Sequence, residues 1–569
     1  MFKNTFKLTG FILKREKTNS SVWIAAMVGI NALLVLLMGF AVLTDAAERI
    51  EMLSMLENPS LQAMVGPLHS INTYDFGSVY TLLMMLMMSI PVAIMNIFHI
   101  IRHTRADEEL GRYEVLRSLP SGRLSNINAA MLSAVILNVA MAILFALTMW
   151  LTVGIADGYW GFAPALLWGV SLGAVGITFA AVAALFSQLC ASSRGAMGFS
   201  FFIMAIFYAI RAGADMDLAR ESEVWAIISP FGLISRSWIY VYNYWWPVLV
   251  VLGIGVVFAA FAYWVCSFRD IDQGVIPARR GRAKGGQLMR STLGLNFRLL
   301  RLSIIVWVIM MFSFGASYSM VLEDIENFVA NNDMYQQLML APVPGLLEQL
   351  EGAPTEEIAA IMNEVLAHQG LNIVQMFSNM IGIPMVMLSL VPVILFITKA
   401  KSEEKNMRTE LLVATAASKK GYLAGLVLFS FVTAFLMQLA QAVGLWSVAQ
   451  SVLPNPGDLP LSFLLQSALV YVPAMWVMGG IVTLLVGLAP KLTGIIWGYF
   501  AFSFVAMMFG RMISQLAFLV NFTPLGFVPQ LPMDEINAVT LVAMALVGVG
   551  LAAVGIVFYE KRDINAVTG

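Results

Sequence analysis

The sequence contains few of the charged residues that cover soluble proteins. Charged residues make up 12% of its 569 residues, hydrophobic residues make up 59%, and the mean hydropathy is +0.81. This composition lies outside the range of soluble globular domains and predicts an integral membrane protein. With 33 lysines and arginines against 34 aspartates and glutamates, the net charge of -1 leaves no basic surplus for a nucleic-acid partner.

Cysteine and recognisable catalytic motifs are also scarce. The two cysteines, Cys190 and Cys266, do not support a disulfide framework. The four histidines show no metal-ligand spacing, and the GxxxxGK[ST] phosphate loop of ATPases does not occur in the sequence. We therefore expect a chain without a catalytic site, a bound metal or a cofactor of its own.

Long apolar runs dominate the chain instead. A helix needs about 20 apolar residues to cross the hydrocarbon core of a bilayer. On this scale the chain contains twelve predicted spans, at residues 22–43, 78–101, 128–152, 165–190, 195–212, 246–266, 302–321, 374–397, 423–446, 461–488, 493–510 and 538–558. We therefore predict an all-α membrane protein with twelve transmembrane helices, preceded by an interfacial helix over residues 1–17.

The distribution of charge between the loops predicts the orientation. Residues 267–301 carry eight lysines and arginines against two aspartates, whereas residues 322–373 carry nine aspartates and glutamates and no lysine or arginine. Short basic loops stay on the cytoplasmic side of a membrane. We therefore predict a protein of the plasma membrane with both termini in the cytoplasm.

A charged stretch occurs twice, which indicates an internal repeat. We call residues 102–124 the first charged loop and residues 398–420 the second charged loop. Four residues of the first recur 296 positions later in the second: Arg105, Glu108, Arg112 and Glu114 as Lys401, Glu404, Arg408 and Glu410. With six spans per copy, we predict two parallel six-helix repeats related by a pseudo-twofold axis along the membrane normal. The predicted domains are residues 1–266, a cytoplasmic linker with a second interfacial helix over 267–301, and residues 302–569.

The predicted spans contain amides but no charged residue near their centres. A charge at mid-bilayer costs about 2.5–3.5 kcal/mol, so proteins keep one there mainly for ion or proton coupling. Amides such as Asn96, Asn138 and Gln438 are more typical of hydrogen bonds between helices than of substrate contacts. Transport driven by a proton or sodium gradient is therefore disfavoured, and the charged loops are where energy can enter.

An arginine ends the fifth predicted span of each half. Arg211 and Arg511 are followed by similar Pro-Gly turns, SPFG at residues 229–232 and TPLG at residues 523–526. The favoured interpretation is that both arginines reach out to the lipid headgroups. The alternative is that they belong to a gate or bind the Pro-Gly turn that follows. The residues of the possible outer gate are Arg211, Pro230, Gly232, Arg511, Pro524 and Gly526.

Short motifs in the loops resemble those of a known family. EELGRYEVL at residues 108–116 follows the second predicted span, and RDI follows the last predicted span of each half, at 269–271 and 562–564. With these motifs the chain resembles the permeases of type 2 ABC exporters, most closely the fused twelve-span branch linked to export of polyketide or tetronasin-like antibiotics. The second copy departs from the pattern, because Met407 stands where the first has Gly111.

The resemblance implies a function and partners. In such permeases the loop after the second span forms a coupling helix that inserts into a cleft of a separately encoded ATPase, two copies of which bind ATP and Mg²⁺. The chain would then export apolar or amphipathic compounds, such as antibiotics and other drugs. The residues expected to dock on the ATPase are Glu108, Glu109, Arg112, Glu114, Glu404, Arg408 and Glu410.

Other functions fit parts of the pattern. A gradient-driven carrier of the major facilitator kind also has six-plus-six parallel halves, and a membrane sensor or scaffold without transport would read a ligand through the acidic loop. The charged loops themselves could be solvated helices without a partner, since i to i+4 pairs such as Glu108 with Arg112 produce the same pattern. The duplication of the loop favours docking.

Overall fold

The computed structural model describes residues 2–41, 49–50, 53, 59–69, 74–118, 120–215, 223–270, 273–276, 286, 291–319, 322, 366, 372–405, 407–414, 418–453, 455–509 and 514–563. The chain divides into two compact units, Met1–Gly281 and Arg282–Gly569, and the division falls within the basic linker. Over the described residues the regular structure is helical, apart from one isolated β-bridge between Cys190 and Ile276. Eleven helices in these ranges are long and apolar enough to cross a membrane, which confirms the all-α membrane class.

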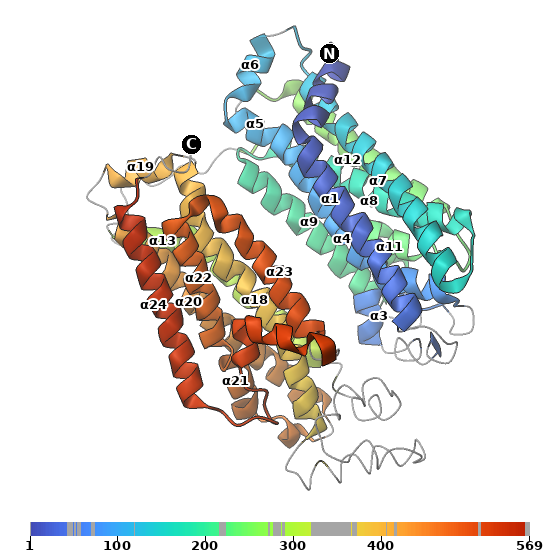
Figure 1. The fold of residues 1–569 in the computed structure, drawn as a ribbon. Helices are drawn as coiled ribbons and strands as arrows, with labels where there is room; N and C mark the ends of the chain where they lie inside the picture. Colours follow the sequence, from blue (N-terminus) through green and yellow to red (C-terminus); the bar gives the residue numbers. More distant parts are fainter. Residues whose placement is uncertain are drawn as a thin grey trace. The chain divides into compact units, whose positions relative to one another are not determined.

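The first unit is built around long helices that satisfy their own backbone hydrogen bonds, as a hydrocarbon environment requires. The long helices are α1 (Thr5–Ala41), α4 (Phe76–His103), α7 (Ser125–Asp157), α8 (Phe162–Leu189), α9 (Ser193–Asp215) and α12 (Trp246–Phe268). The short helices are α3 (Pro59–Val65), α5 (Arg105–Glu109), α6 (Arg112–Ser118), α10 (Glu223–Ile228) and α11 (Pro230–Ser235). Within this unit, α5 and α6 lie at the end where the chain begins, and α3 lies at the opposite end (Figure 1).

The second unit contains long helices in a similar order. They are α13 (Thr292–Ser319), α18 (Ile373–Lys405), α20 (Lys419–Val452), α22 (Val472–Leu488) and α24 (Ala538–Lys561), with the shorter α19 (Arg408–Val413), α21 (Leu461–Leu469) and α23 (Ile495–Phe509) between them. The predicted span at 493–510 corresponds to α23, whose 15 residues fall short of a full crossing. The count of twelve spans and the parallel repeat therefore stay predictions.

The interfacial helix predicted over residues 1–17 is not separate from the first span. Residues Thr5–Ala41 form one continuous α1 of 37 residues. This stretch contains no proline, and lysine and arginine are good helix formers, so the basic segment extends the helix. The second predicted interfacial helix is likewise continuous with its span, because α13 runs from Thr292 to Ser319 without a break.

The predicted span at 461–488 consists of two helices. α21 ends at Leu469, and α22 begins at Val472 with Pro473 in its first turn. Proline has no backbone N–H to donate to the preceding turn, so it interrupts a continuous helix, whereas it fits well at a helix start.

Glycines allow several long helices to pack backbone against backbone. A Cβ added at Gly169 of α8 would lie 2.1 Å from a backbone oxygen of α7. In the second unit, a Cβ at Gly487 of α22 would lie 2.2 Å from the carbonyl oxygen of Gly555 in α24, and one at Gly444 of α20 would lie 2.2 Å from the carbonyl oxygen of Phe312 in α13. Such close approach is a common basis of helix association in membranes, where the hydrophobic effect does not drive helices together.

Candidate functional site

The first charged loop forms two short helices after α4. α5 follows a break at Thr104, and α6 follows a turn at Leu110 and Gly111. Gly111 has a φ of 68°, in the left-handed region that glycine enters at little cost. This glycine therefore explains why the loop divides into two helices here.

The second charged loop keeps this turn with a different residue. α18 continues through Lys405, and Met407 precedes α19 with a φ of 59°. The left-handed region costs a residue with a side chain about 1–2 kcal/mol relative to glycine. Both loops therefore share the backbone turn, although the sequence gives Gly111 in one and Met407 in the other.

In each unit a buried carboxylate of the charged loop binds the arginine that follows the last long helix. Arg269 Nη2 donates to Glu108 Oε2 at 2.9 Å. In the second unit, Arg562 Nη2 lies 2.8 and 2.7 Å from the two carboxylate oxygens of Glu404. The Glu108 and Glu404 side chains are only 5% and 1% exposed. Such pairs are costly to break, because the charge that remains would be buried without its partner.

A basic residue near the end of each loop binds the backbone of the same arginine. Arg123 Nη2 donates to the carbonyl oxygen of Arg269 at 2.9 Å, and Lys419 Nζ donates to the carbonyl oxygen of Arg562 at 3.3 Å. Each charged loop thereby fixes the end of α12 or α24. We call these contacts the first arginine clamp, of Glu108, Arg123 and Arg269, and the second arginine clamp, of Glu404, Lys419 and Arg562.

The arginine clamps were not predicted from the sequence. The RDI motifs that contain Arg269 and Arg562 contributed to the family resemblance, and no contact was predicted for either arginine. A usable signal was present, because Arg123 and Lys419 are separated by the same 296 positions as the other matched residues of the loops. A basic residue that recurs in register with a recurring carboxylate indicates a shared ionic contact.

Each charged loop also contacts the start of the fifth main helix of its unit. The Glu109 carboxylate accepts hydrogen bonds from the backbone N–H and the hydroxyl of Ser193, at 2.8 and 2.6 Å, where α9 begins. The partial positive charge of a helix N-terminus favours a carboxylate there. Next to the start of α23, Lys401 Nζ donates to Thr493 Oγ1 at 2.7 Å. Different side chains thus make equivalent connections in the two units.

The first long helix of each unit is connected to the loop as well. Arg15 of α1 donates from Nη1 and Nη2 to the two carboxylate oxygens of Asp107, at 2.9 and 3.0 Å, in a bidentate geometry. In the second unit, Lys399 Nζ donates to the carbonyl oxygen of Leu299 in α13 at 3.2 Å. Each charged loop is therefore bonded to the first, fifth and sixth main helices, in addition to the two helices that it joins.

The glutamates predicted to dock on a partner are partly engaged within the chain. Glu108 and Glu404 are buried in the arginine clamps, and Glu109 is exposed but bonded to α9. Arg112 forms an ion pair with Asp107, at 3.0 Å, where the i to i+4 pattern predicted one with Glu108, which binds Arg269 instead. Burial removes the carboxylates of Glu108 and Glu404 from the surface that a soluble partner can touch.

The other predicted docking residues lie nearer the surface. The side chains of Arg112 and Arg408 are 57% and 54% exposed. Arg408 binds Glu403 at 3.3 Å, in the same way that Arg112 binds Asp107. Glu114 is exposed and Glu410 is half-buried. Docking by these residues stays a prediction.

The exposed side of the first charged loop combines apolar and charged residues. Leu110 and Val115 are 62% and 66% exposed. They lie beside the exposed Arg112 and Glu114 on α6 and the turn before it. Apolar side chains surrounded by charges are typical of a surface that a soluble protein covers. We call Leu110, Arg112, Glu114 and Val115 the loop surface.

Arg211 at the end of α9 does not reach out to lipid headgroups. Its side chain is 0% exposed, and its Nη1 lies 3.2 Å from Asp215 Oδ2. Arg236 Nη2 binds the other oxygen of Asp215 at 3.0 Å, and Arg211 Nη2 donates to the carbonyl oxygen of Ala63 in α3. A buried charge needs such partners. Arg211 therefore joins the end of α9 to α3.

The Pro-Gly turns approach a preceding backbone segment closely. A Cβ at Gly232 would lie 2.2 Å from the carbonyl oxygen of Ala226, and a Cβ at Gly526 would lie 2.2 Å from that of Val520. The six-residue separation is the same in both units. Each turn therefore requires glycine for steric reasons.

Proline opens the short helix of each turn. Pro230 begins α11, and Pro524 begins the 3₁₀-helix Pro524–Phe527. Proline fits at a helix start because the N–H that it lacks has no partner within the helix there. Arg511, the remaining residue of the possible outer gate, lies outside the described residues, so the gate stays a prediction.

Asn96 of α4 and Asn138 of α7 bind each other inside the first unit. Asn96 Nδ2 donates to Asn138 Oδ1 at 3.1 Å, and Asn138 Nδ2 donates to Asn96 Oδ1 at 2.6 Å. Each amide also donates to a backbone carbonyl of its own helix. This reciprocal pair serves as a contact between helices.

The apolar helices and the loops that tie their ends together define a polytopic all-α membrane protein. The family model described as "Multidrug efflux system permease Rv1217c, C-terminal domain" matches residues 8–269, 289–353 and 345–560. The chain therefore belongs to this family of efflux permeases. It is 26% identical over 572 residues to the multidrug efflux system permease protein Rv1217c of Mycobacterium tuberculosis (strain ATCC 25618 / H37Rv), covering 99% of this chain and 96% of that relative. Both names describe a permease of a transport system.

Proposed function

We propose that this chain is the membrane subunit of an ATP-driven exporter of the type 2 ABC class, in the fused branch that resembles tetronasin exporters. Two copies of a separately encoded ATPase bind ATP and Mg²⁺, and each charged loop docks on one copy. The duplicated arginine clamp is the observation that carries this proposal. Solvated loops without a partner would leave their carboxylates in water. In this chain each unit instead buries one loop glutamate, Glu108 or Glu404, in an ion pair with the arginine that follows its last long helix.

The loop surface supplies the docking contact in the first unit. Leu110 and Val115 provide apolar area to bury, and Arg112 and Glu114 provide charges that select a complementary partner. The buried residues of the first arginine clamp contribute differently, because they hold the loop in the shape that the partner binds.

Movement of a docked loop is transmitted through its connections to the helices. Closure of the two ATPase subunits around ATP displaces the loops, and each loop pulls on the ends of the first, fifth and sixth main helices to which it is bonded. Buried ion pairs transmit such a force better than exposed pairs, since exposed pairs exchange readily with water.

The transported compounds are apolar or amphipathic and drug-like. This assignment is supported by membership of the multidrug efflux permease family and by spans that carry neutral amides rather than charges near their centres. In this mechanism the compounds enter from the cytoplasm or the inner leaflet, and ATP hydrolysis by the partner subunits drives their release outside.

The test is drug-stimulated ATP hydrolysis by the chain and its ATPase in proteoliposomes. The variant combines Glu114→Lys and Val115→Asp, which change the loop surface and leave the arginine clamp intact. Glu535→Lys, at an exposed position before α24, is the control with the same charge reversal. We expect the double variant to lower stimulated hydrolysis about tenfold, which requires a loss of about 1.4 kcal/mol in docking, and the control to leave it unchanged.

Two outcomes would contradict the proposal. Unchanged hydrolysis in the double variant would show that the loop surface does not take part in docking. Drug movement by the purified chain on a proton or sodium gradient, without nucleotide or ATPase, would identify a gradient-driven carrier.

A further inference from the structure

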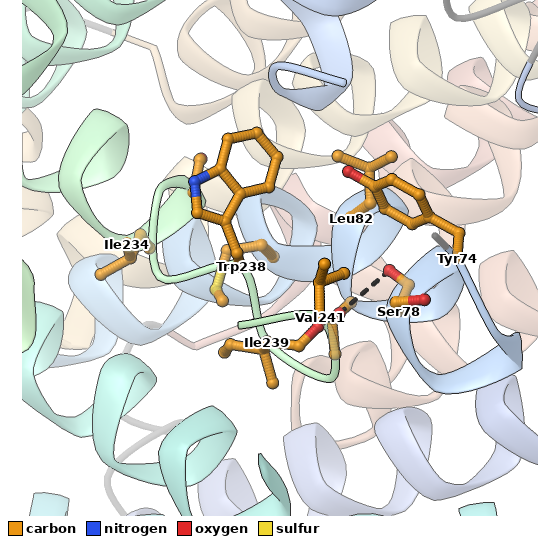
Figure 2. A pocket seen from close by; sticks show the side chains of 10 residues that line it. Tyr74, Ser78, Leu82, Ile234, Trp238, Ile239 and Val241 are labelled. Carbon is orange, nitrogen blue, oxygen red and sulfur yellow. Dashed lines mark hydrogen bonds between the residues drawn. The ribbon is translucent and has the colours of Figure 1, made fainter. Parts of the chain in front are cut away.

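The pocket between the start of α4 and the segment after α11 is too small for a drug-sized ligand. Figure 2 shows it with Trp238 on one side and with Tyr74 and Ser78 on the other. Its free volume of about 20 Å³ has room for about one water molecule. The start of α1, in contrast, presents an extended surface that is open to a large partner.

The two sides of the start of α1 differ in chemistry. On one side Thr9, Ile12 and Glu16 are only 3%, 5% and 3% exposed. Thr9 Oγ1 donates to the carbonyl oxygen of Ala129 in α7 at 3.5 Å, and Arg102 of α4 binds Glu16 at 3.1 Å. This side therefore packs on the first unit, and the opposite side faces away from it.

The outward side combines lysines with phenylalanines. Lys7, Phe11 and Lys14 are spaced i, i+4 and i+7, so they lie along one side of the helix. All three are exposed, as are Lys17 and Phe6; the exposed fraction is 82% for Phe6 and 55% for Phe11. We call Phe6, Lys7, Phe11, Lys14 and Lys17 the basic face of α1.

The lysines of the basic face have no partner within the described ranges. None of their three ammonium groups forms an ion pair or a hydrogen bond there, and the only acidic residue of the sequence up to position 21, Glu16, is buried on the opposite side. Arg15 and Arg102, by contrast, are paired with Asp107 and Glu16. The basic face therefore carries three positive charges without a counter-charge, which favours an anionic ligand.

The exposed side of α1 continues from the basic face into the span. Phe11, Val22 and Leu33 follow one another at intervals of about three turns and are 55%, 63% and 56% exposed. In a helix that crosses a bilayer, this line of apolar side chains contacts lipid. Lys14 and Ala41 are 27 positions apart in the same helix, a rise of about 40 Å, close to the thickness of a bilayer with its headgroup regions. Lys14 therefore lies at the level of the headgroups.

We propose that the basic face of α1 binds anionic phospholipid headgroups, in the inner leaflet if the termini are oriented as predicted. The ammonium groups contact the phosphates, and Phe6 and Phe11 insert beside the acyl chains. An acidic soluble protein would also satisfy the lysines, but the continuity with the lipid-exposed side of the span favours the membrane. This binding requires neither ATP nor an ATPase, so it goes beyond the proposed function and does not depend on it.

The basic face is connected to the first charged loop at two places. Asn4 Nδ2 donates to the carbonyl oxygen of Pro120 at 2.9 Å, and Arg15 binds Asp107 at 2.9 Å. Anionic lipid that holds the start of α1 therefore also holds this loop.

The test is native mass spectrometry of the full-length chain in detergent, titrated with phosphatidylglycerol or with phosphatidylcholine. We expect the first molecule of phosphatidylglycerol to bind at least about tenfold more tightly than the zwitterionic lipid, because each lysine near an anionic surface contributes about fivefold in affinity. The basic-face variant, with Lys7→Gln, Lys14→Gln and Lys17→Gln, should lose this preference. Its substitutions are at exposed positions, so it should fold normally.

A matched control removes the same charge elsewhere. It carries Lys405→Gln, Lys491→Gln and Lys561→Gln, three exposed positions of the second unit, and should keep the preference for phosphatidylglycerol. An equal loss in both variants would assign the preference to net charge and overturn the proposal, as would an unchanged preference in the basic-face variant. Loss of ATPase binding in that variant, with lipid binding unchanged, would assign the face to a protein partner and overturn it as well.

Hydrogen exchange in nanodiscs tests the connection to the loop. Replacing phosphatidylcholine by phosphatidylglycerol should slow amide exchange over residues 105–118, which include α5 and α6, in the unchanged protein and not in the basic-face variant. Equal exchange in the two lipids would refute the connection between bound lipid and the first charged loop.

Discussion

Removing the Arg562 side chain is expected to destabilise the second unit by about 3 kcal/mol. The Glu404 side chain is 1% exposed, so Arg562→Ala would leave a buried carboxylate without its guanidinium. Breaking a buried pair in this way costs about 3–5 kcal/mol, and the 12% exposure of Arg562 places the cost near the lower limit. With an unfolding entropy of about 2.1 cal/mol/K per residue, a unit of about 290 residues should lose about 5 °C in Tm.

Thermal melting of the full-length chain in nanodiscs measures this effect. The series comprises Arg562→Ala, Glu404→Gln and both changes together, with Glu114→Ala as an exposed control expected to shift the Tm by about 1 °C or less. Because the two side chains form one pair, the double variant should be less destabilised than the sum of the single variants, by about 2 kcal/mol. Additive effects, or a Tm for Arg562→Ala that matches the control, would refute the reasoning.

Three further substitutions test the turns and the helix contacts. Met407→Gly should stabilise its turn by about 1 kcal/mol, and Gly111→Met should destabilise the equivalent turn by a similar amount. Limited proteolysis measures both effects, with slower cleavage of the second charged loop in the first variant and faster cleavage of the first charged loop in the other. Gly555→Ala should destabilise the second unit by about 1–3 kcal/mol, because its Cβ would lie 2.6 Å from the backbone of α22. Gly550→Ala is the control: its Cβ would meet nothing within 4 Å, so this variant should melt at or above the temperature of the unchanged protein. Asn138→Leu should lower the Tm of the first unit by the equivalent of about 1–3 kcal/mol, since Asn96 on α4 loses both of its hydrogen bonds to Asn138.

The transmembrane helices could be predicted from the sequence because hydrocarbon imposes a simple rule on apolar runs. Eleven predicted spans have a long helix in the described residues. Helix ends were harder to predict, because α1 continues through its basic segment to Thr5 and α18 continues into the second charged loop as far as Lys405. Composition does not reveal such continuity when a charged segment has high helix propensity.

The candidate site was located from the sequence but its contacts were not. The duplicated loops identified Glu108 and Glu404, yet each binds an arginine more than 150 positions away, 161 in the first unit and 158 in the second. No local pattern specifies contacts at that separation. The burial of Arg211 was missed for the same reason, since Ala63 and Arg236 come from other segments of the chain.

The glycine contact between α22 and α24 limits how the second unit can change shape. With backbone against backbone at Gly487 and Gly555, neither helix can rotate about its axis or advance by one residue without driving a side chain into a carbonyl group. The two helices must move as a single rod. A displacement of Arg562 at the end of α24 then moves α22 as well. Any change in helix packing has to occur where bulkier side chains separate this pair from the neighbouring helices.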